Sequence, residues 1–293
     1  MRVNRVLSIL GYVGVAILAW LVLATLWLWR NQERVVFQPP VAVAPDPAAG
    51  RRVEIRAADG HPTFGFLVPA NGGNAQTVVI AFHGNADLAV WLVPWAQELS
   101  RRAGVTVLVP EYRGYGGVAG QPSYLGAAAD ALGALEYART LKPARVVLFG
   151  HSLGTAIAVE LANAMGHTPP AALVLQSPFT SARDMASRML MPVVPWVWAR
   201  SARFHYDTRA SVRELDVPGW VAHGRIDITI PSRMGRDVFE NARRKGELLL
   251  VAGAGHNDVA ELGGEPYWQW LATATAASTP VRELEQQGRR RLP

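Results

Sequence analysis

The sequence predicts an α/β domain built on a mostly parallel, eight-stranded sheet with flanking helices. Short apolar segments alternate with helix-length segments, which is the pattern of parallel strands joined by helical connections. The later strands are continuous apolar runs such as VVLFG and ALVLQ between turn residues, as expected of strands buried on both faces. Setting aside an N-terminal apolar segment leaves roughly 230–250 of the 293 residues, which suits one α/β domain.

The elements follow from these patterns in chain order. The predicted strands are Arg52–Ile55, Gly65–Val68, Thr77–Phe82, Val105–Pro110, Arg145–Phe149, Ala172–Gln176, Gly219–Ala222 and Glu247–Val251. The predicted helices are Val90–Arg102, Ala127–Leu141, Thr155–Met165, Ser232–Arg243 and Pro266–Ala276. No helix separates the first two strands, so we expect them to form an antiparallel hairpin that leads into the sheet.

The first thirty residues predict a transmembrane helix. Val6–Trp29 is an uncharged run of 24 residues, which as a helix would extend about 36 Å and could cross a hydrocarbon core of about 30 Å. Trp27 and Trp29 lie at its end, where indole rings favour the membrane interface. A cleaved signal peptide would have a shorter apolar core of about 7–15 residues. We therefore interpret residues 6–29 as an uncleaved signal anchor.

The rest of the chain divides into three parts. Residues 30–50 contain four prolines and are interpreted as an extended juxtamembrane linker. Residues 51–279 form the folded domain, and residues 280–293 a flexible basic tail. Within the domain, residues 178–216 interrupt the alternation of strands and helices and are interpreted as a short lid insert. Its apolar side chains would suit an acyl chain or a membrane face, or would pack onto the domain core.

Composition excludes several kinds of site. The net charge of +6 invites a nucleic-acid interpretation, but no zinc-finger spacing, aromatic RNA-binding motif or long basic run accompanies it. The absence of cysteine excludes disulfides, thiolate metal sites and a cysteine nucleophile. No metal-ligand cluster or dinucleotide-binding glycine motif is present, so we expect neither a metal nor a cofactor.

The motif Gly150-His151-Ser152-Leu153-Gly154 predicts a nucleophilic serine. It matches G-x-S-x-G, in which the serine occupies a sharp turn between a strand and a helix. The strand pattern before Gly150 and the helical pattern after Gly154 supply that context. The glycines are needed because neighbouring backbone passes too close for a side chain.

A serine needs a base, and the base needs an orienting acid. His256 lies in a glycine-rich loop after the last predicted strand, where it would open onto the catalytic edge of the sheet. Asp227 follows the preceding strand, also at its carboxyl end. The alternative acid is Asp258, two residues from His256, but its carboxylate would meet the wrong side of the ring. Ser152, Asp227 and His256 are therefore the predicted catalytic residues.

The turn after Thr77–Phe82 is the candidate oxyanion loop. Gly84 permits close approach to the substrate, and the backbone N–H of Asn85 is the candidate donor. The second donor would be the N–H of Leu153, directly after the nucleophile. We interpret two other histidines, His83 in this turn and His223 at a strand end, as structural.

Five motifs in this order and spacing resemble the α/β-hydrolase superfamily: HGN, EYRGYG, GHSLG, HGRID and GAGHND. The most similar groups are the serine aminopeptidase-like hydrolases and the α/β-hydrolase-domain depalmitoylases. The resemblance covers most of residues 51–276 and implies an α/β-hydrolase fold, with nucleophile, acid and base on Ser152, Asp227 and His256. It also implies a cofactor-independent reaction through an acyl-enzyme. The cysteine-rich N-terminus of the depalmitoylases is absent here, and a transmembrane segment stands in its place.

These observations predict a membrane-anchored serine hydrolase that cleaves an ester, thioester or amide. An acyltransferase would use the same nucleophile and base on the same fold. A non-catalytic, membrane-tethered binding module is the third alternative. The intact Ser152, Asp227 and His256 argue against it, because a binding module has no need of them.

We expect a single-pass protein of the inner (cytoplasmic) membrane with its catalytic domain on the periplasmic side. Arg2 and Arg5 precede the apolar run, and Arg30 and Arg34 follow it with Glu33 between them. The positive-inside rule favours a cytoplasmic N-terminus by a small margin. A short N-terminal tail before a large folded domain is typical of a signal anchor and supports the same orientation.

Overall fold

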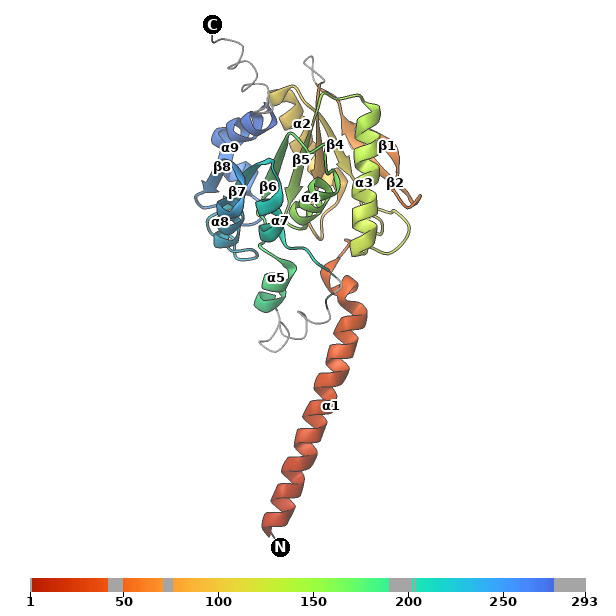
Figure 1. Ribbon diagram of the computed structural model, residues 1–293, viewed down its shortest axis with the longest axis vertical. Coiled ribbons are helices and arrows are strands. Elements are labelled where there is room, and N and C mark those ends of the chain that lie inside the picture. The colour runs from red at the N-terminus through yellow and green to blue at the C-terminus, as the bar shows by residue number, and fades with distance from the viewer. Residues whose placement is uncertain (1, 42–49, 71–75, 190–201, 203, 277–293) are drawn as a thin grey trace.

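The computed structural model describes residues 2–41, 50–70, 76–189, 202 and 204–276 (Figure 1). Its strands are β1 (Arg51–Arg56), β2 (Pro62–Val68), β3 (Thr77–Phe82), β4 (Thr106–Pro110), β5 (Arg145–His151), β6 (Ala172–Gln176), β7 (Pro218–Gly224) and β8 (Arg244–Val251). Its helices are α1 (Arg2–Val36), α2 (Ala89–Ala103), α3 (Tyr124–Thr140), α4 (Leu153–Ala164), α5 (Ala182–Met189), α7 (Thr208–Glu214), α8 (Ser232–Asn241) and α9 (Val259–Ala276).

The eight strands form one sheet in the order β1-β2-β4-β3-β5-β6-β7-β8. β1 and β2 pair antiparallel, as do β2 and β4, and every later pair is parallel. The predicted eight-stranded, mostly parallel sheet with an antiparallel hairpin at its start is therefore confirmed. All residues of β3, β4 and β6 are buried, which explains their uninterrupted apolar sequences.

Helices cover both faces of the sheet. α2 and α9 pack against each other on one face, while α3, α4, α7 and α8 follow one another across the other. The central parallel strands thereby lie in the apolar core, whereas the edge strand β8 stays partly exposed. The loops that leave their carboxyl ends remain free to carry polar side chains at one edge of the domain.

The insert is more regular than its sequence indicates. It contains two short helices that were not predicted, α5 and α7. The side chain of Asp207 begins α7 by accepting a hydrogen bond from the N–H of Ala210 at 3.0 Å, and α7 packs against α4. Much of its apolar stretch lies outside the described residues, including Met191, Pro192, Pro195, Trp196 and Trp198.

The helix α1 differs from the prediction at its carboxyl end. It continues past Trp29 to Val36, because residues 30–36 contain neither glycine nor proline and Pro39 is the first residue that cannot continue a helix. Leu7–Val36 is long and apolar enough to cross a membrane, and an 18-residue window within it has a mean hydropathy of 2.3. A signal sequence close to the N-terminus would have the same properties. Figure 1 shows α1 projecting away from the domain at the end where α5 lies.

The extended linker that was predicted over residues 30–50 is therefore shorter than expected, since its first seven residues are helical. Residues 42–49 of that linker lie outside the described part of the chain, as does the predicted basic tail over residues 280–293.

Candidate active site

Ser152 lies in the sharp turn between β5 and α4. Its backbone has φ 52° and ψ −116°, a conformation that a residue with a side chain rarely adopts. A Cβ on Gly150 would lie 2.3 Å from the carbonyl oxygen of Gly154, and one on Gly154 would lie 2.2 Å from that of Phe82. Both positions therefore require glycine, as the sequence predicts. The turn is held in a strained form by close backbone packing on both sides.

The structure brings the three predicted catalytic residues together at the carboxyl edge of the sheet. Nε2 of His256 lies 3.0 Å from Oγ of Ser152, and Nδ1 of His256 lies 2.7 Å from Oδ2 of Asp227. The carboxylate can only accept, so the imidazole donates its Nδ1–H to Asp227. Nε2 is then free to accept the hydroxyl proton of Ser152.

Asp227 is held firmly by the loop that follows β7. Its Oδ1 accepts hydrogen bonds from the backbone N–H groups of Thr229 and Ile230, at 2.9 Å and 2.8 Å. Burial by itself would raise the pKa of Asp227, but the hydrogen bonds from His223 and His256 outweigh it and hold that pKa well below its usual range. The residue is therefore a fixed negative charge beside His256.

Asp258, the alternative acid, has a different position. Its Oδ1 accepts the N–H of Gly255 at 2.7 Å, which shapes the loop that carries His256. None of the hydrogen bonds of the described residues joins Asp258 to the imidazole of His256. The geometry accordingly favours Asp227 as the partner of the imidazole.

His151 packs against the loop that carries His256. Its Nε2 lies 3.2 Å from the carbonyl oxygen of His256, and the two rings are 5.3 Å apart. Burial, assisted by the neighbouring His256, lowers the pKa of His151 to about 4. At neutral pH His151 is thus uncharged and donates to the backbone of the residue that faces Ser152.

The loop after β3 lies directly against the nucleophile. A Cβ on Gly84 would be 3.5 Å from Cβ of Ser152. The N–H of Asn85 donates to no acceptor among the described residues, and Leu153 is the first residue of α4, where an N–H lacks an acceptor within the helix. Neither of these two N–H groups, the predicted oxyanion donors, is therefore engaged by an acceptor among the described residues.

A buried ion pair stabilises the loop that follows β3. Nε2 of His83 lies 2.8 Å from Oε1 of Glu111, and both side chains are fully buried. Nδ1 of His83 donates to the carbonyl of Gly84, while Oε2 of Glu111 accepts the N–H of Ala89. Burial alone would lower the pKa of His83, but the charge of Glu111 and its hydrogen bond raise it above the usual value.

Three features of this site were not predicted from the sequence. His223 and His83 were interpreted only as structural, and Glu111 was given no role. In the structure His223 lies 3.2 Å from Oδ2 of Asp227, and His83 pairs with Glu111. A usable signal was present, because each of these residues stands at the carboxyl end of a parallel strand and such ends meet at one edge.

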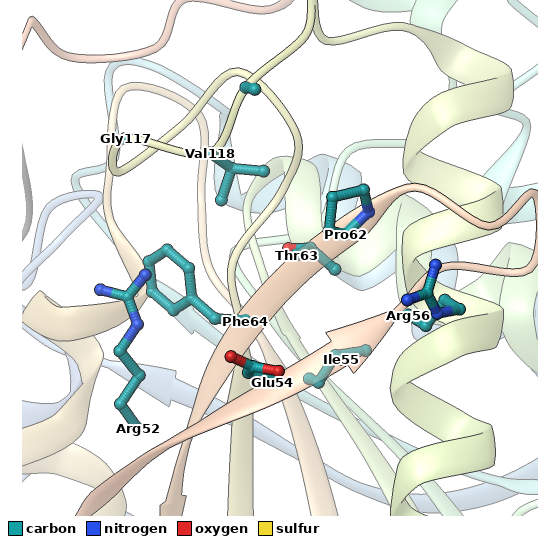
Figure 2. A pocket seen from close by; sticks show the side chains of 10 residues that line it. Arg52, Glu54, Ile55, Arg56, Pro62, Thr63, Phe64, Gly117 and Val118 are labelled. Carbon is teal, nitrogen blue, oxygen red and sulfur yellow. The ribbon is translucent and has the colours of Figure 1, made fainter.

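A sizeable cavity lies away from this site. It has a volume of about 530 Å³ and opens at the edge of the sheet between β1, β2 and the loop after β4. Figure 2 shows its lining, in which the guanidinium of Arg52 stacks on the ring of Phe64, 3.7 Å from the ring centre. It contains none of the predicted catalytic residues. In the described part of the chain, no group of His, Asp or Glu side chains could hold a metal ion.

Comparisons with known proteins identify the family. The family model "Serine aminopeptidase, S33" matches residues 73–209. The chain is 34% identical over 247 residues to the uncharacterized protein Rv2307c of Mycobacterium tuberculosis, covering 82% of this chain and 85% of that one. It is 31% identical over 201 residues to human alpha/beta hydrolase domain-containing protein 17B, covering 68% and 65%. The chain belongs to the α/β-hydrolase superfamily.

Solved structures show the same fold for this α/β hydrolase. The esterase Pf2001 of Pyrococcus furiosus superposes with a TM-score of 0.63 over 82% of this chain and 98% of the esterase, at 16% identity. Est1E of Butyrivibrio proteoclasticus, solved with ferulic acid, gives a TM-score of 0.64 over 77% and 100%, at 18% identity. The family is one of serine hydrolases and esterase-type enzymes, so the protein is classed as a hydrolase.

Proposed function

We propose that this hydrolase cleaves an acyl ester, thioester or amide with Ser152 as nucleophile, His256 as base and Asp227 as the acid that orients the base. The observation that carries the proposal is the continuous chain of hydrogen bonds from Ser152 through His256 to Asp227, at 3.0 Å and 2.7 Å. These two distances support the roles that acyl transfer requires of the three groups.

The reaction follows from these positions. Oγ of Ser152 attacks the acyl carbon while its proton passes to Nε2 of His256. The carbonyl oxygen becomes an oxyanion, stabilised by the N–H groups of Asn85 and Leu153. The tetrahedral intermediate then expels an alcohol, thiol or amine, which takes the proton from His256. Water repeats the sequence on the acyl-enzyme and releases the acid and free Ser152.

We further propose that α1 anchors the enzyme in the inner membrane, with the hydrolase domain in the periplasm. Support comes from the length and hydropathy of Leu7–Val36 and from the exposure of its most apolar part, none of which is buried against the domain. The end of α1 contacts the loop after β3, which lies against Ser152. The anchor thus places the carboxyl edge of the sheet, and the site on it, toward the membrane.

A fluorophosphonate probe tests the nucleophile. The wild-type chain should be labelled, and Ser152→Ala should not be labelled, because the probe reacts only with an activated hydroxyl. Ser187→Ala is a suitable control, since Ser187 donates only within α5 to the carbonyl of Arg183 and should leave labelling unchanged. Equal labelling of Ser152→Ala and wild type would remove Ser152 from the mechanism.

The substrate class is tested with p-nitrophenyl esters of graded chain length, together with thioesters and aminoacyl amides. Turnover that disappears in Ser152→Ala supports the hydrolase. Acyl transfer to added alcohols or amines, in preference to water, would identify an acyltransferase instead. A wild-type chain that neither reacts with the probe nor turns over any substrate would favour the binding module.

A further inference from the structure

The side chain of Asn85 binds the end of α1 and the residues that follow it. Its Oδ1 accepts the N–H of Gln38 at 2.9 Å, and its Nδ2 donates to the carbonyl of Val36 at 2.5 Å. The hydroxyl of Tyr115 donates to the same Oδ1 at 2.8 Å. One amide group therefore joins the loop after β3, the loop after β4 and the juxtamembrane segment.

Residues 36–38, here called the juxtamembrane segment, are also packed against the domain. Phe37 is 2% exposed, and its ring lies 6.1 Å from that of Phe204 in the insert. Phe204 in turn packs edge-on against Tyr124, at 6.0 Å. The N–H of Phe37 donates to the carbonyl of Glu33, which continues the last turn of α1. Residues 36–38 are thus bound at both the aromatic cluster and Asn85.

The loop that carries Asn85 needs such support. Ala86 has φ 52°, in the left-handed region that residues with a Cβ rarely adopt. The side chain of Asn85 makes three hydrogen bonds. Its backbone N–H has no acceptor among the described residues. Among the hydrogen bonds of the described residues, those of the side chain are therefore the ones that hold Asn85 in position.

We propose that Asn85 is a positioning residue through which residues 36–38 hold the oxyanion donor in place, so that the juxtamembrane segment is part of the active site. The carbonyl of Val36 and the N–H of Gln38 fix the Asn85 amide, and the rigid side chain fixes the peptide beside Ser152. The anchor thereby sets the catalytic rate as well as the location of the enzyme. The inference rests on the proposed function, in which the N–H of Asn85 faces the oxyanion.

The test uses full-length protein in detergent micelles with p-nitrophenyl butyrate as the probe substrate. Loss of one oxyanion donor lowers kcat by about 10²–10³. Asn85→Ala keeps the backbone N–H but removes the side-chain hydrogen bonds that hold the loop. We therefore expect kcat to fall by roughly tenfold or more while KM changes less than about twofold. Tyr115→Phe removes one hydroxyl from the same amide and keeps the ring, so it should give a smaller loss in kcat even if Asn85→Ala folds poorly.

Two further sets of variants distinguish an effect on the position of Asn85 from a general loss of protein stability. Phe37→Ala should also lower kcat, and the double variant with Asn85→Ala should lose less than the product of the two single losses, because both release one segment. Asn31→Ala is the matched control: its amide bonds only to the carbonyl of Trp27 within α1, so activity should be unchanged.

The failures are distinguishable. Activity that survives Ser152→Ala contradicts the proposed function, and the inference is then overturned with it. Activity that depends on Ser152 but keeps a wild-type kcat in Asn85→Ala overturns the inference alone. A loss in Asn85→Ala that follows only the fraction of folded protein, with kcat per folded molecule unchanged, overturns it as well.

Discussion

Nε2 of His223 lies 3.2 Å from Oδ2 of Asp227, the same carboxylate oxygen that receives Nδ1 of His256. It also lies 2.8 Å from the carbonyl oxygen of Ile230. A single buried imidazole thus contacts the carboxylate and the backbone of the loop that carries it. Nδ1 of His223 has no partner among the described residues, so the function of the ring in this site rests on Nε2.

His223→Ala should therefore weaken the orientation of Asp227. A hydrogen bond to a charged group contributes about 1.5–3 kcal/mol, and we expect a loss in kcat of roughly tenfold to a hundredfold. Steady-state kinetics with a p-nitrophenyl ester measures it. His167→Ala changes an exposed histidine in the turn that follows α4 and should leave kcat unchanged. An equal effect of the two substitutions would show that His223 has no special relation to Asp227.

Asp227→Asn should cost far more than Asp258→Asn. The amide that replaces the Asp227 carboxylate would favour the wrong tautomer of His256, and a loss of about 10³–10⁴ in kcat is the usual consequence in such triads. Asp258→Asn retains an oxygen that can accept the N–H of Gly255, so its loss should stay below about tenfold. Parallel kcat measurements decide the matter. The reverse ranking would assign the orienting role to Asp258.

The pair of His83 and Glu111 predicts a pH-dependent stability. The pKa of His83 is raised above 6.5 in the folded protein, so the stabilisation is complete below that pH and is lost as the pH rises through the folded value. Breaking a buried ion pair costs about 3–5 kcal/mol. Glu111→Gln should accordingly lower the free energy of unfolding most near pH 6 and progressively less in alkaline solution.

Denaturant unfolding of the full chain in detergent, from about pH 6 to about pH 9, measures this difference. Glu240→Gln, which removes an exposed carboxylate, supplies the control and should show no comparable trend. A gap between wild type and Glu111→Gln that widens with pH would contradict the charged state of His83.

The orientation of the anchor is tested by a reporter at the carboxyl terminus. Alkaline phosphatase folds only in an oxidising compartment, so a fusion after Pro293 should be active in a bacterial host if the domain is periplasmic. A cytoplasmic reporter at the same position should be inactive. A silent phosphatase together with an active cytoplasmic reporter would reverse the orientation and leave the proposed catalytic residues untouched.

Sequence patterns were sufficient for the strands and for the candidate triad. β3 and β6 were predicted with their observed bounds, because strands buried on both faces must be apolar throughout. Ser152 was identifiable from the two glycines, and Asp227 and His256 from their positions after consecutive parallel strands. Patterns failed where helices are short or polar: α5 and α7 span only 8 and 7 residues, and the last turns of α1 are mostly polar.

The sequence by itself thus determined the fold class, the candidate nucleophile with its base and acid, and the apolar segment that could cross a membrane. Only the tertiary structure decided which distant residues support them. His83 meets Glu111, and Asn85 meets the backbone at the end of α1, across 28 and 49 positions of the chain. Such contacts leave no local pattern, because a hydrogen bond depends on distance and direction in space, and these are set only when the strands take their order in the sheet.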